Sequence, residues 1–191
     1  MNKKLTTNGY GIETPANKIA TAQAVLSLAF RLNSEVLAGR INAEIFSREV
    51  AVVTGSKGVM LPAFPQGTTD ELHRGIYNIV LIALSASALT VDETLDEVFG
   101  KISEDKDPNR IGIRVMVNQL RNAFAHHPWS PRWKINPKYR NSYAIALDDG
   151  TTCTFDATAL DGDGVKPEQV GGLEFWVKVL QHCERLVSAK V

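Results

Sequence analysis

Residues 76–89 of the chain, IYNIVLIALSASAL, contain no charged side chain and are apolar on nearly every face of a helix. Such a helix is usually central to a bundle, because other elements must cover it on all sides. Thr68 and Glu71 precede it with the spacing of a capping box, which predicts where the helix begins. The apolar run is too short to span a membrane. We therefore expect a soluble cytoplasmic protein without a membrane partner.

A second long helix is expected before this segment. Thr14 and Pro15 have the pattern of an N-cap followed by proline in the first turn, and apolar residues then recur at helical spacing. Gly39 either ends this helix or lies inside a longer one that reaches Val53. The stretch 54–67 is rich in glycine and proline and is expected to be a loop.

Local signals after the central segment predict three more helices. A second capping box at residues 90–93 predicts a short separate helix that ends at Gly100. A cap followed by proline begins the stretch 107–127, and a proline comes directly after it. We expect this helix to end at His126 or at the residue after it, because a residue before proline disfavours helical geometry. Residues 168–189 have the apolar spacing of a final amphipathic helix.

A hairpin signal lies between the last two helices. Ser142–Leu147 and Thr151–Phe155 are strand-like stretches that flank an Asp-Asp-Gly turn. The fold class expected from all these signals is an all-α helical bundle of four to five main helices, with a small β-hairpin insert before the last helix. The length of 191 residues fits a single domain over residues 1–191, in which residues 128–166 form a Pro-rich loop and hairpin elaboration.

Charge is distributed unevenly along a chain whose formal net charge is +0. Residues 108–147 contain seven Lys or Arg and no Asp or Glu, whereas residues 148–174 contain seven acids and one Lys. Trp129, Trp133 and Tyr139 lie within the basic stretch. Basic and aromatic side chains together are typical of a groove for single-stranded nucleic acid, although the tryptophans also suit packing of the Pro-rich segment. The acidic stretch is a candidate cover for the basic one.

The cysteines do not indicate a metal centre. Cys153 and Cys183 are the only two, they are far apart, and neither belongs to a Cys-x-x-Cys pair. Two reduced thiols therefore fit better than a disulfide or a metal site. We expect neither a metal nor a cofactor.

The richest chemistry lies in residues 121–126, RNAFAH, at the expected end of a helix. Arginine can hold and polarise a phosphate, and histidine can move a proton near neutral pH. Asn122 and His126 are i,i+4 neighbours on a helix, whereas Arg121 and His126 diverge by roughly 140°. Either the last turn is distorted before Pro128, or a second subunit completes the cleft.

The pattern R-N-x-x-x-H, late in a helical bundle, resembles the HEPN superfamily (higher eukaryotes and prokaryotes nucleotide-binding). Arg121 matches the arginine of the family motif, Asn122 the polar residue after it, and His126 the histidine. The resemblance covers about residues 15–127 and the last helix. The hairpin region matches nothing in the family core.

The resemblance implies a metal-independent endoribonuclease that leaves 2′,3′-cyclic phosphate ends and acts as a toxin or antiviral defence effector. His126 would assist the attack of the 2′-hydroxyl or protonate the leaving oxygen, and Arg121 would stabilise the pentacovalent phosphate. Asn122 would orient the histidine or bind phosphate. Family members are typically homodimers with a composite site, and the toxin–antitoxin members suggest an antitoxin or regulatory protein as a further partner beside RNA.

Further residues near the motif are candidates for contact with RNA. They are Arg110, Arg114, Asn118, His127, Trp129, Arg132, Trp133 and Lys134. Arg110 and Arg114 also fit a solvated helix face or pairs with acids elsewhere. Two other interpretations stay open for the whole chain. One is a non-catalytic HEPN-like dimerisation module that binds a nucleotide, RNA or a partner protein. The other is a scaffold in which the motif only holds the helix end to the hairpin, with the histidine capping the last carbonyls.

Overall fold

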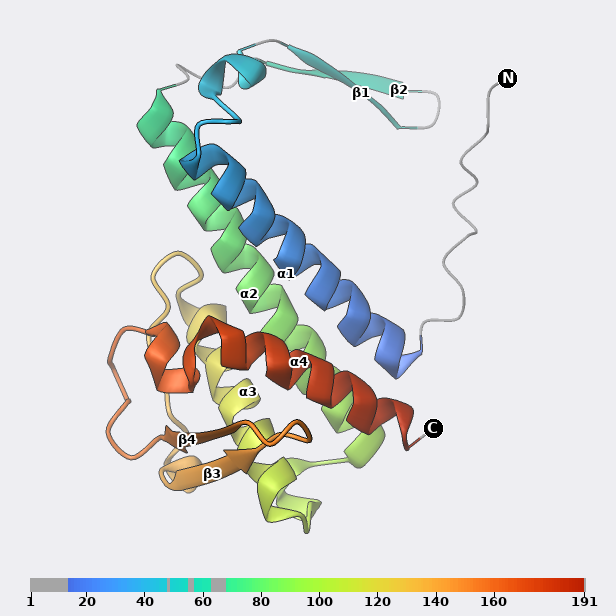
Figure 1. Ribbon diagram of the computed structural model, residues 1–191, viewed down its shortest axis with the longest axis vertical. Coiled ribbons are helices and arrows are strands. Elements are labelled where there is room, and N and C mark those ends of the chain that lie inside the picture. Colours follow the sequence, from blue (N-terminus) through green and yellow to red (C-terminus); the bar gives the residue numbers. More distant parts are fainter. Residues whose placement is uncertain (1–13, 48, 55–56, 63–67, 191) are drawn as a thin grey trace. The chain divides into compact units, whose positions relative to one another are not determined.

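The computed structural model describes residues 14–47, 49–54, 57–62 and 68–190. Within these ranges the chain forms four α-helices and two antiparallel β-hairpins, so the expected mostly helical class is confirmed, with one hairpin more than expected (Figure 1). The polar N-terminal stretch and part of the expected loop, residues 55–56 and 63–67, lie outside the described residues.

The chain divides into two compact units. Unit 2 comprises Val25–Leu84, and unit 1 comprises the described residues before and after that range. Two helices, α1 (Pro15–Leu37) and α2 (Thr69–Phe99), are continuous from one unit into the other.

Unit 2 contains the second half of α1, the first half of α2 and the chain between them. Gly39 has φ 71°, a left-handed conformation that ends α1 instead of extending it to Val53. Strand β1 (Val50–Thr54) then pairs with β2 (Lys57–Leu61), where we expected a helix end and a loop. A small core packs the chain between α1 and β1 against the two helices. It comprises Val36, Leu72 and Ile76, with Leu32, Ile41, Ala43 and Phe46 packed against them.

Helix α2 begins at the predicted capping box. The amide of Glu71 donates to Oγ1 of Thr68 at 3.3 Å, and the amide of Thr68 donates to Oε2 of Glu71 at 3.5 Å. The second capping box does not start a new helix: α2 continues past Thr90 to Gly100, which has φ 74°. The expected cover on all sides is also missing, because α2 leaves several large apolar side chains exposed. By length and composition alone, α2 would be long and apolar enough to cross a membrane, and 44% of its most apolar window is buried.

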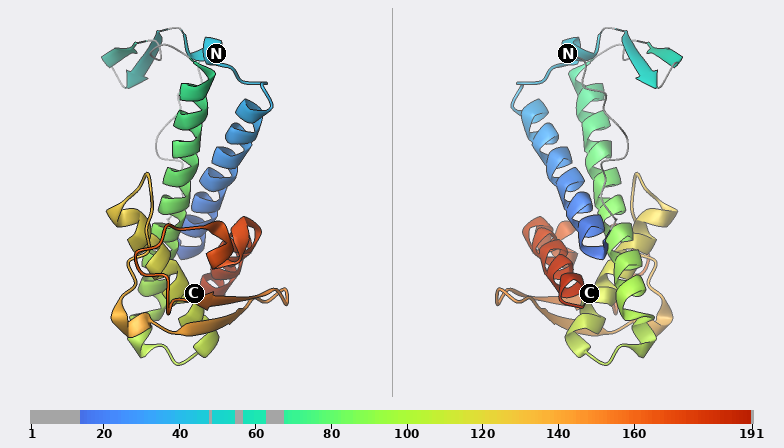
Figure 2. Two further views of the ribbon diagram at one scale, coloured as in Figure 1. Left: turned by 90° about the vertical axis from the view of Figure 1, so that its left-hand side faces the viewer. Right: turned by 90° about the vertical axis from the view of Figure 1, so that its right-hand side faces the viewer.

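Helices α3 (Pro108–His126) and α4 (Gly172–Ser188) form the core of unit 1 with the adjoining parts of α1 and α2 (Figures 1 and 2). The side chain of Asp107 caps α3 by accepting from the amides of Asn109 and Arg110. The start and end of α3 therefore confirm the prediction. In α4, the indole Nε1 of Trp176 donates to Oγ of Ser87 on α2 at 3.1 Å.

The predicted hairpin is present as β3 (Ser142–Ala146) and β4 (Thr152–Asp156) and packs on α3 (Figure 2). The side-chain amide of Asn109 donates to the carbonyl of Ala146 at 2.8 Å, and its Oδ1 accepts from the amide of Ala146 at 2.7 Å. Gly112 lets the strand approach, since a Cβ there would lie 3.3 Å from Tyr143 and Ile145. The hairpin is thus part of the packed body of unit 1.

Candidate functional site

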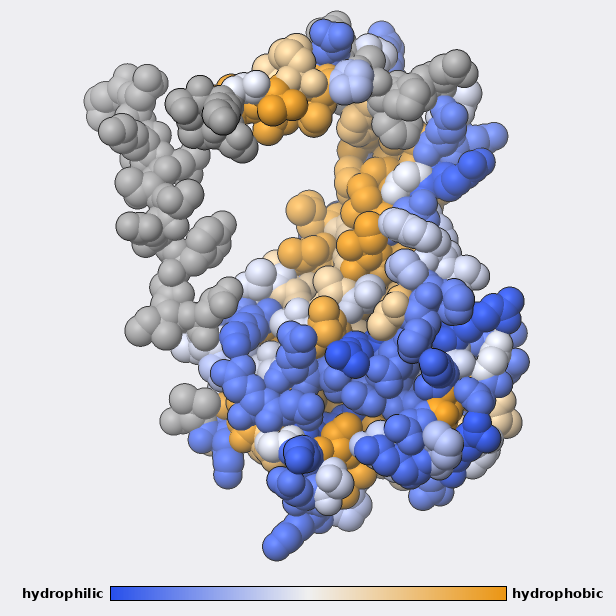
Figure 3. Space-filling view, turned by 180° about the vertical axis from the view of Figure 1, so that it is seen from behind, coloured by the Kyte–Doolittle hydropathy of each residue, from blue (hydrophilic) through white to orange (hydrophobic). Residues whose placement is uncertain are grey.

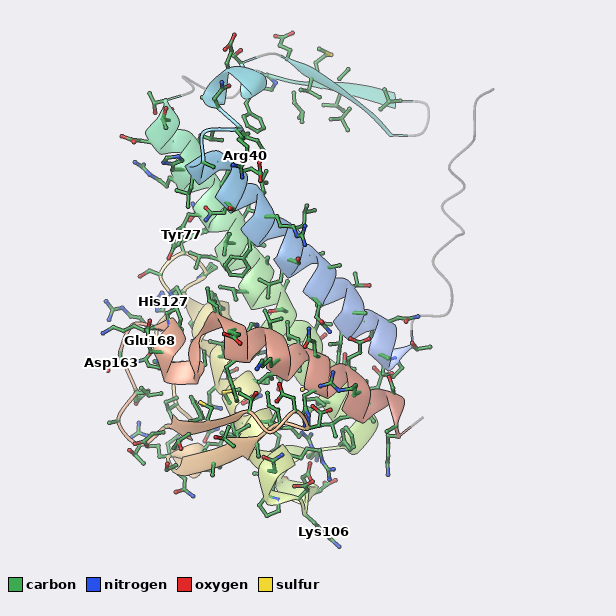
Figure 4. All side chains as sticks on the ribbon, viewed as in Figure 1. Arg40, Tyr77, Lys106, His127, Asp163 and Glu168 are labelled. Atoms are coloured by element: carbon green, nitrogen blue, oxygen red, sulfur yellow. The ribbon has the colours of Figure 1, made fainter. Side chains whose placement is uncertain are left out.

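The end of α3 presents both histidines to solvent. His126 lies in the last turn, and His127 is the C-cap residue that follows it (Figure 4). Neither imidazole has a hydrogen-bond partner in the part of the chain that the structure describes. His126 is therefore accessible to a ligand. The scaffold interpretation would instead require this side chain to be buried against the hairpin, and it is exposed.

Arg121 is held from two sides. Its Nη1 donates to Oδ1 of Asn122 at 3.0 Å, and its Nε lies 3.8 Å from Oδ2 of Asp92 on α2. The Arg121 side chain is 38% exposed, whereas that of Asp92 is 8% exposed. The guanidinium therefore rests on a buried carboxylate and still reaches solvent, which suits an arginine that receives a phosphate.

A network of amides fixes this carboxylate, and we call its members the polar cluster: Asp92, Asn118, Gln119, Arg121 and Asn122. The Nδ2 of Asn118 donates to both carboxylate oxygens of Asp92, at 3.2 and 3.1 Å. Oδ1 of Asn118 in turn accepts from Gln119 at 2.8 Å and from Asn122 at 3.4 Å. Asn122 and Asp92 contact Arg121 directly, and Asn118 is hydrogen-bonded to both of them. These three side chains therefore determine the position of Arg121.

Burial dominates the protonation of Asp92. Desolvation raises the pKa of its carboxyl above the ordinary value, and the nearby charge of Asp96 acts in the same direction. The hydrogen bond from Asn118 and the positive charges of Arg121 and Arg114 partly oppose this rise. The ion pair with Arg121 consequently breaks at a higher pH than an exposed aspartate would allow.

Asn122 is hydrogen-bonded to Arg121 and, among the described residues, makes no hydrogen bond to the motif histidine. Its amide is engaged by Arg121 and Asn118, and none of the described contacts links it to His126. The i,i+4 proximity expected from the sequence therefore does not produce an Asn–His hydrogen bond. Within one chain, the structure brings Arg121, Asn122 and Asn118 together and leaves His126 apart from them.

Two of the candidate RNA-binding arginines are engaged inside the protein. Nη1 of Arg114 lies 2.9 Å from Asp105 and its Nη2 lies 2.7 Å from Asp96, with a further bond to the carbonyl of Gly100. Arg110 makes a two-point pair with Asp105 at 2.7 and 2.6 Å. Since the Arg114 side chain is only 1% exposed, it has no surface to offer a phosphate.

Asp105 is the centre of that ion pair network. Burial alone would raise its pKa, but hydrogen bonds from Arg110, from the amide of Asp107 and from Arg114 outweigh burial and hold the pKa well below its usual range. The network joins the start of α3 to the end of α2. Its role is to stabilise the helix pair that carries the polar cluster.

The aromatic and basic residues after α3 separate into two groups. Trp133 is buried against Phe155, and its Nε1 donates to Oε1 of Gln169 at 2.8 Å, which favours the packing interpretation for this ring. Trp129, by contrast, is 58% exposed, and Arg132 and Lys134 are exposed as well. We call five exposed residues from the last residue of α3 onward the post-helix strip: His126, His127, Trp129, Arg132 and Lys134.

The loop of residues 161–164, which we call the acidic loop and which belongs to the acidic stretch 148–174, lies against the segment around Trp133. The amide of Trp133 donates to the carbonyl of Asp163 at 2.8 Å, and the amide of Gly162 donates to the carbonyl of Trp133 at 2.9 Å. Asp161 pairs with Arg140. Part of the basic charge is therefore neutralised from within the chain.

The described residues contain no group of three His, Cys, Asp or Glu side chains placed to share a metal ion. No protein-family model matches the chain, and neither a curated protein nor a solved structure matches it at a significant level.

Proposed function

We propose that the chain is a metal-independent endoribonuclease of the HEPN type that cleaves RNA and leaves 2′,3′-cyclic phosphate ends. The observation that carries this proposal is the support of Arg121 by the buried Asp92, close in sequence to the exposed His126 on the same helix. Arg114 is also held by a buried carboxylate but is only 1% exposed, whereas Arg121 is held in this way and still reaches solvent at 38% exposure.

The side chains fit the chemistry of RNA cleavage by its own 2′-hydroxyl. His126 would take the proton of that hydroxyl or return a proton to the leaving 5′-oxygen. The free N–H donors of Arg121 would stabilise the charge on the pentacovalent phosphate. Since no described hydrogen bond or ion pair joins Arg121 and His126 within one chain, we propose a homodimer with a composite site. The post-helix strip would supply the surface for the flanking RNA.

The resemblance also supplies the biological setting of this proposal. The protein would act in the cytoplasm as a toxin or an antiviral defence effector, and an antitoxin or other regulatory protein would restrain it. The acidic loop beside the basic segment is compatible with regulation within the chain as well.

A cleavage assay in EDTA tests the proposal. Wild-type protein and the variants Arg121→Ala and His126→Ala would be incubated with a mixed RNA pool, and the fragment ends would be analysed. We expect 2′,3′-cyclic phosphate ends from the wild type and a loss of at least about a hundredfold in rate from either variant. His73→Ala, which changes a histidine in unit 2, is the matched control and should cleave like the wild type.

A second candidate is a non-catalytic module that binds a nucleotide, RNA or a partner protein. The observation that favours it is the absence of an orienting partner for His126 among the described residues, since Asn122 is engaged by Arg121. Binding of RNA by wild type and His126→Ala alike, without cleavage by either, would replace the first candidate by this one.

A further inference from the structure

Unit 2 exposes apolar side chains on the outward faces of both helices. On α1, Val25, Leu28 and Leu37 are 50%, 67% and 65% exposed. On α2, Tyr77, Ile79 and Ile82 are also about half exposed, and the ring of Tyr77 is labelled in Figure 4. A helix of a soluble monomer normally has polar residues on its solvent-exposed side, whereas these helices have large apolar residues there.

The hairpin β1–β2 has the same character. Val50, Val52 and Val53 on β1 and Val59, Met60 and Leu61 on β2 are all exposed. Since neighbouring residues of a strand point to opposite faces, the hairpin is apolar on both faces. Figure 3 shows the apolar side chains gathered on this hairpin and along the helices of unit 2. We call these twelve residues of α1, α2 and the hairpin the apolar surface.

The apolar surface is large enough to be an interface. Side chains of this size bury on the order of 100 Å² or more when they leave solvent, so the twelve half-exposed ones present roughly 600 to 1,000 Å² over all their faces, of which one contact covers part. The largest apolar patch on a typical monomer measures about 300–600 Å². A standard dimer buries about 800 Å² per partner.

The charge of unit 2 favours a second copy of the chain as the occupant. Residues 25–84 contain five Lys or Arg and five Asp or Glu, which gives a formal charge of zero. Residues 25–30 of α1 and 75–84 of α2 contain no charged residue. A charged partner has nothing to recognise there, whereas two copies meet without repulsion. An anionic membrane would select an excess of basic residues, which unit 2 lacks.

We propose that unit 2 is a self-association module in which the apolar surface packs against the same surface of a second copy. The contact is isologous, because one self-complementary patch serves both partners. Two helix pairs joined in this way give a four-helix arrangement whose apolar faces are turned inward. This contact uses residues other than those at the end of α3 and does not depend on any ribonuclease activity.

Solution mass over a concentration series is the direct test. Gel filtration with light scattering, from about 1 to 100 µM, should give wild type at least twice the chain mass of 20.9 kDa. The double variant Ile79→Glu and Ile82→Glu should raise the dissociation constant by about a hundredfold or more, because the charges would be buried without partners. Leu173→Glu, on α4 and 40% exposed, is the matched control in unit 1 and should leave the dimer intact.

Other results would overturn the proposal. Wild type that stays at 20.9 kDa throughout would do so regardless of the variants. A dimer that the charged variants leave intact would place the interface elsewhere. Monomeric protein that floats with phosphatidylcholine–phosphatidylglycerol vesicles would identify a membrane as the occupant. Circular dichroism checks folding, and Leu28→Glu on α1 replaces the double variant if that variant unfolds. His126→Ala separates the two proposals, because it should abolish cleavage and leave the mass unchanged.

Discussion

Oδ2 of Asp92 on α2 lies 3.8 Å from Nε of Arg121 on α3, and the carboxylate is almost completely buried. The arginine of the motif is thus joined to a second helix by a charge that solvent hardly reaches. Its orientation depends on the packing of α2 against α3 as well as on α3 itself.

Removing the charge of Asp92 should reduce the rate of RNA cleavage but should not abolish cleavage. Asp92→Asn keeps the shape but loses the ion pair, and we expect kcat to fall about tenfold to a hundredfold, since a misplaced catalytic group costs about that much. Steady-state cleavage of a labelled RNA gives kcat and KM separately. Glu93→Gln, an exposed acid next to it on α2, is the control. An unchanged kcat in Asp92→Asn would show that Arg121 does not need this partner.

The same residue predicts a change in the pH profile. Because burial raises the pKa of Asp92, the wild type should lose activity on acidification at a pH above the ordinary aspartate value of 3.8. Asp92→Asn has no proton to gain there, so that acid limb should be absent from its profile. The measurement is kcat against pH for both proteins. Identical acid limbs would exclude Asp92 as the titrating group.

Asp105 should control stability in acid. Its folded-state pKa is lowered, so its contribution to stability is present above the ordinary value of 3.8 and is lost as the pH falls below it. Asp105→Asn should therefore cost about 3–5 kcal/mol at pH 7, because Arg110 and the buried Arg114 lose their shared carboxylate and Arg114 keeps only Asp96 as an ion-pair partner. It should cost less near pH 2, where the wild type has already lost part of this contribution. Urea unfolding at both pH values measures this, with Asp163→Asn on the exposed loop as control.

Two adjacent glycines before α4 form a matched pair. Gly171 and Gly172 both have positive φ, at 81° and 88°. A Cβ at Gly171 would lie 2.8 Å from Phe175 and 2.9 Å from the sulfur of Cys153, whereas a Cβ at Gly172 meets nothing within 4 Å. Both Gly→Ala changes cost about 1–2 kcal/mol for the backbone, and Gly171→Ala should cost about 1–3 kcal/mol more for the overlap. Thermal unfolding compares the two, and equal losses would contradict the packing at Gly171.

The post-helix strip should bind RNA through charge and stacking. Arg132→Ala and Lys134→Ala should each lower the slope of log affinity against log salt by about 0.7, and Trp129→Ala should weaken binding by about 1–3 kcal/mol without changing that slope. Fluorescence anisotropy of a labelled oligonucleotide at several salt concentrations measures both effects. Lys106→Ala, an exposed lysine outside the strip (Figure 4), should change neither.

Local signals predicted helix boundaries well because they act locally. Thr14, Thr68 and Asp107 cap helices through side chains that reach only two or three residues ahead. Thr90 has the same pattern but does not begin a helix. Val91 and Leu95 are buried, so continuing the helix keeps that apolar face in the core, and no glycine or proline interrupts it.

The hairpin β1–β2 escaped prediction for a different reason. Its residues are exposed on both faces, so they show no alternation of apolar and polar residues from which a strand could be recognised. In one of the two alternatives that the sequence leaves open, the valines before residue 54 lie at the end of a long helix. The sequence alone does not decide whether the first helix ends at Gly39 or reaches Val53. The structure decides it, because Gly39 has a left-handed conformation that ends α1.

The candidate site was predictable only in part. The position of Arg121, Asn122 and His126 at the end of a helix followed from the proline after it. The partners of Arg121 and Arg114 did not, because Asp92 and Asp96 lie on another helix and periodicity gives no information on what a polar face meets. Sequence could therefore place the motif on a helix end, but it could not identify the carboxylate behind the arginine.

Because the tryptophans differ in exposure, intrinsic tryptophan fluorescence can report on ligand binding to this protein. Trp133 and Trp176 are buried, at 2% and 1% exposure, whereas Trp129 reaches solvent beside His127. A dissolved quencher such as iodide should therefore dim mainly the red edge of the emission, which comes from Trp129. Protection of that edge by RNA would report docking at the end of α3 without any label and without cleavage.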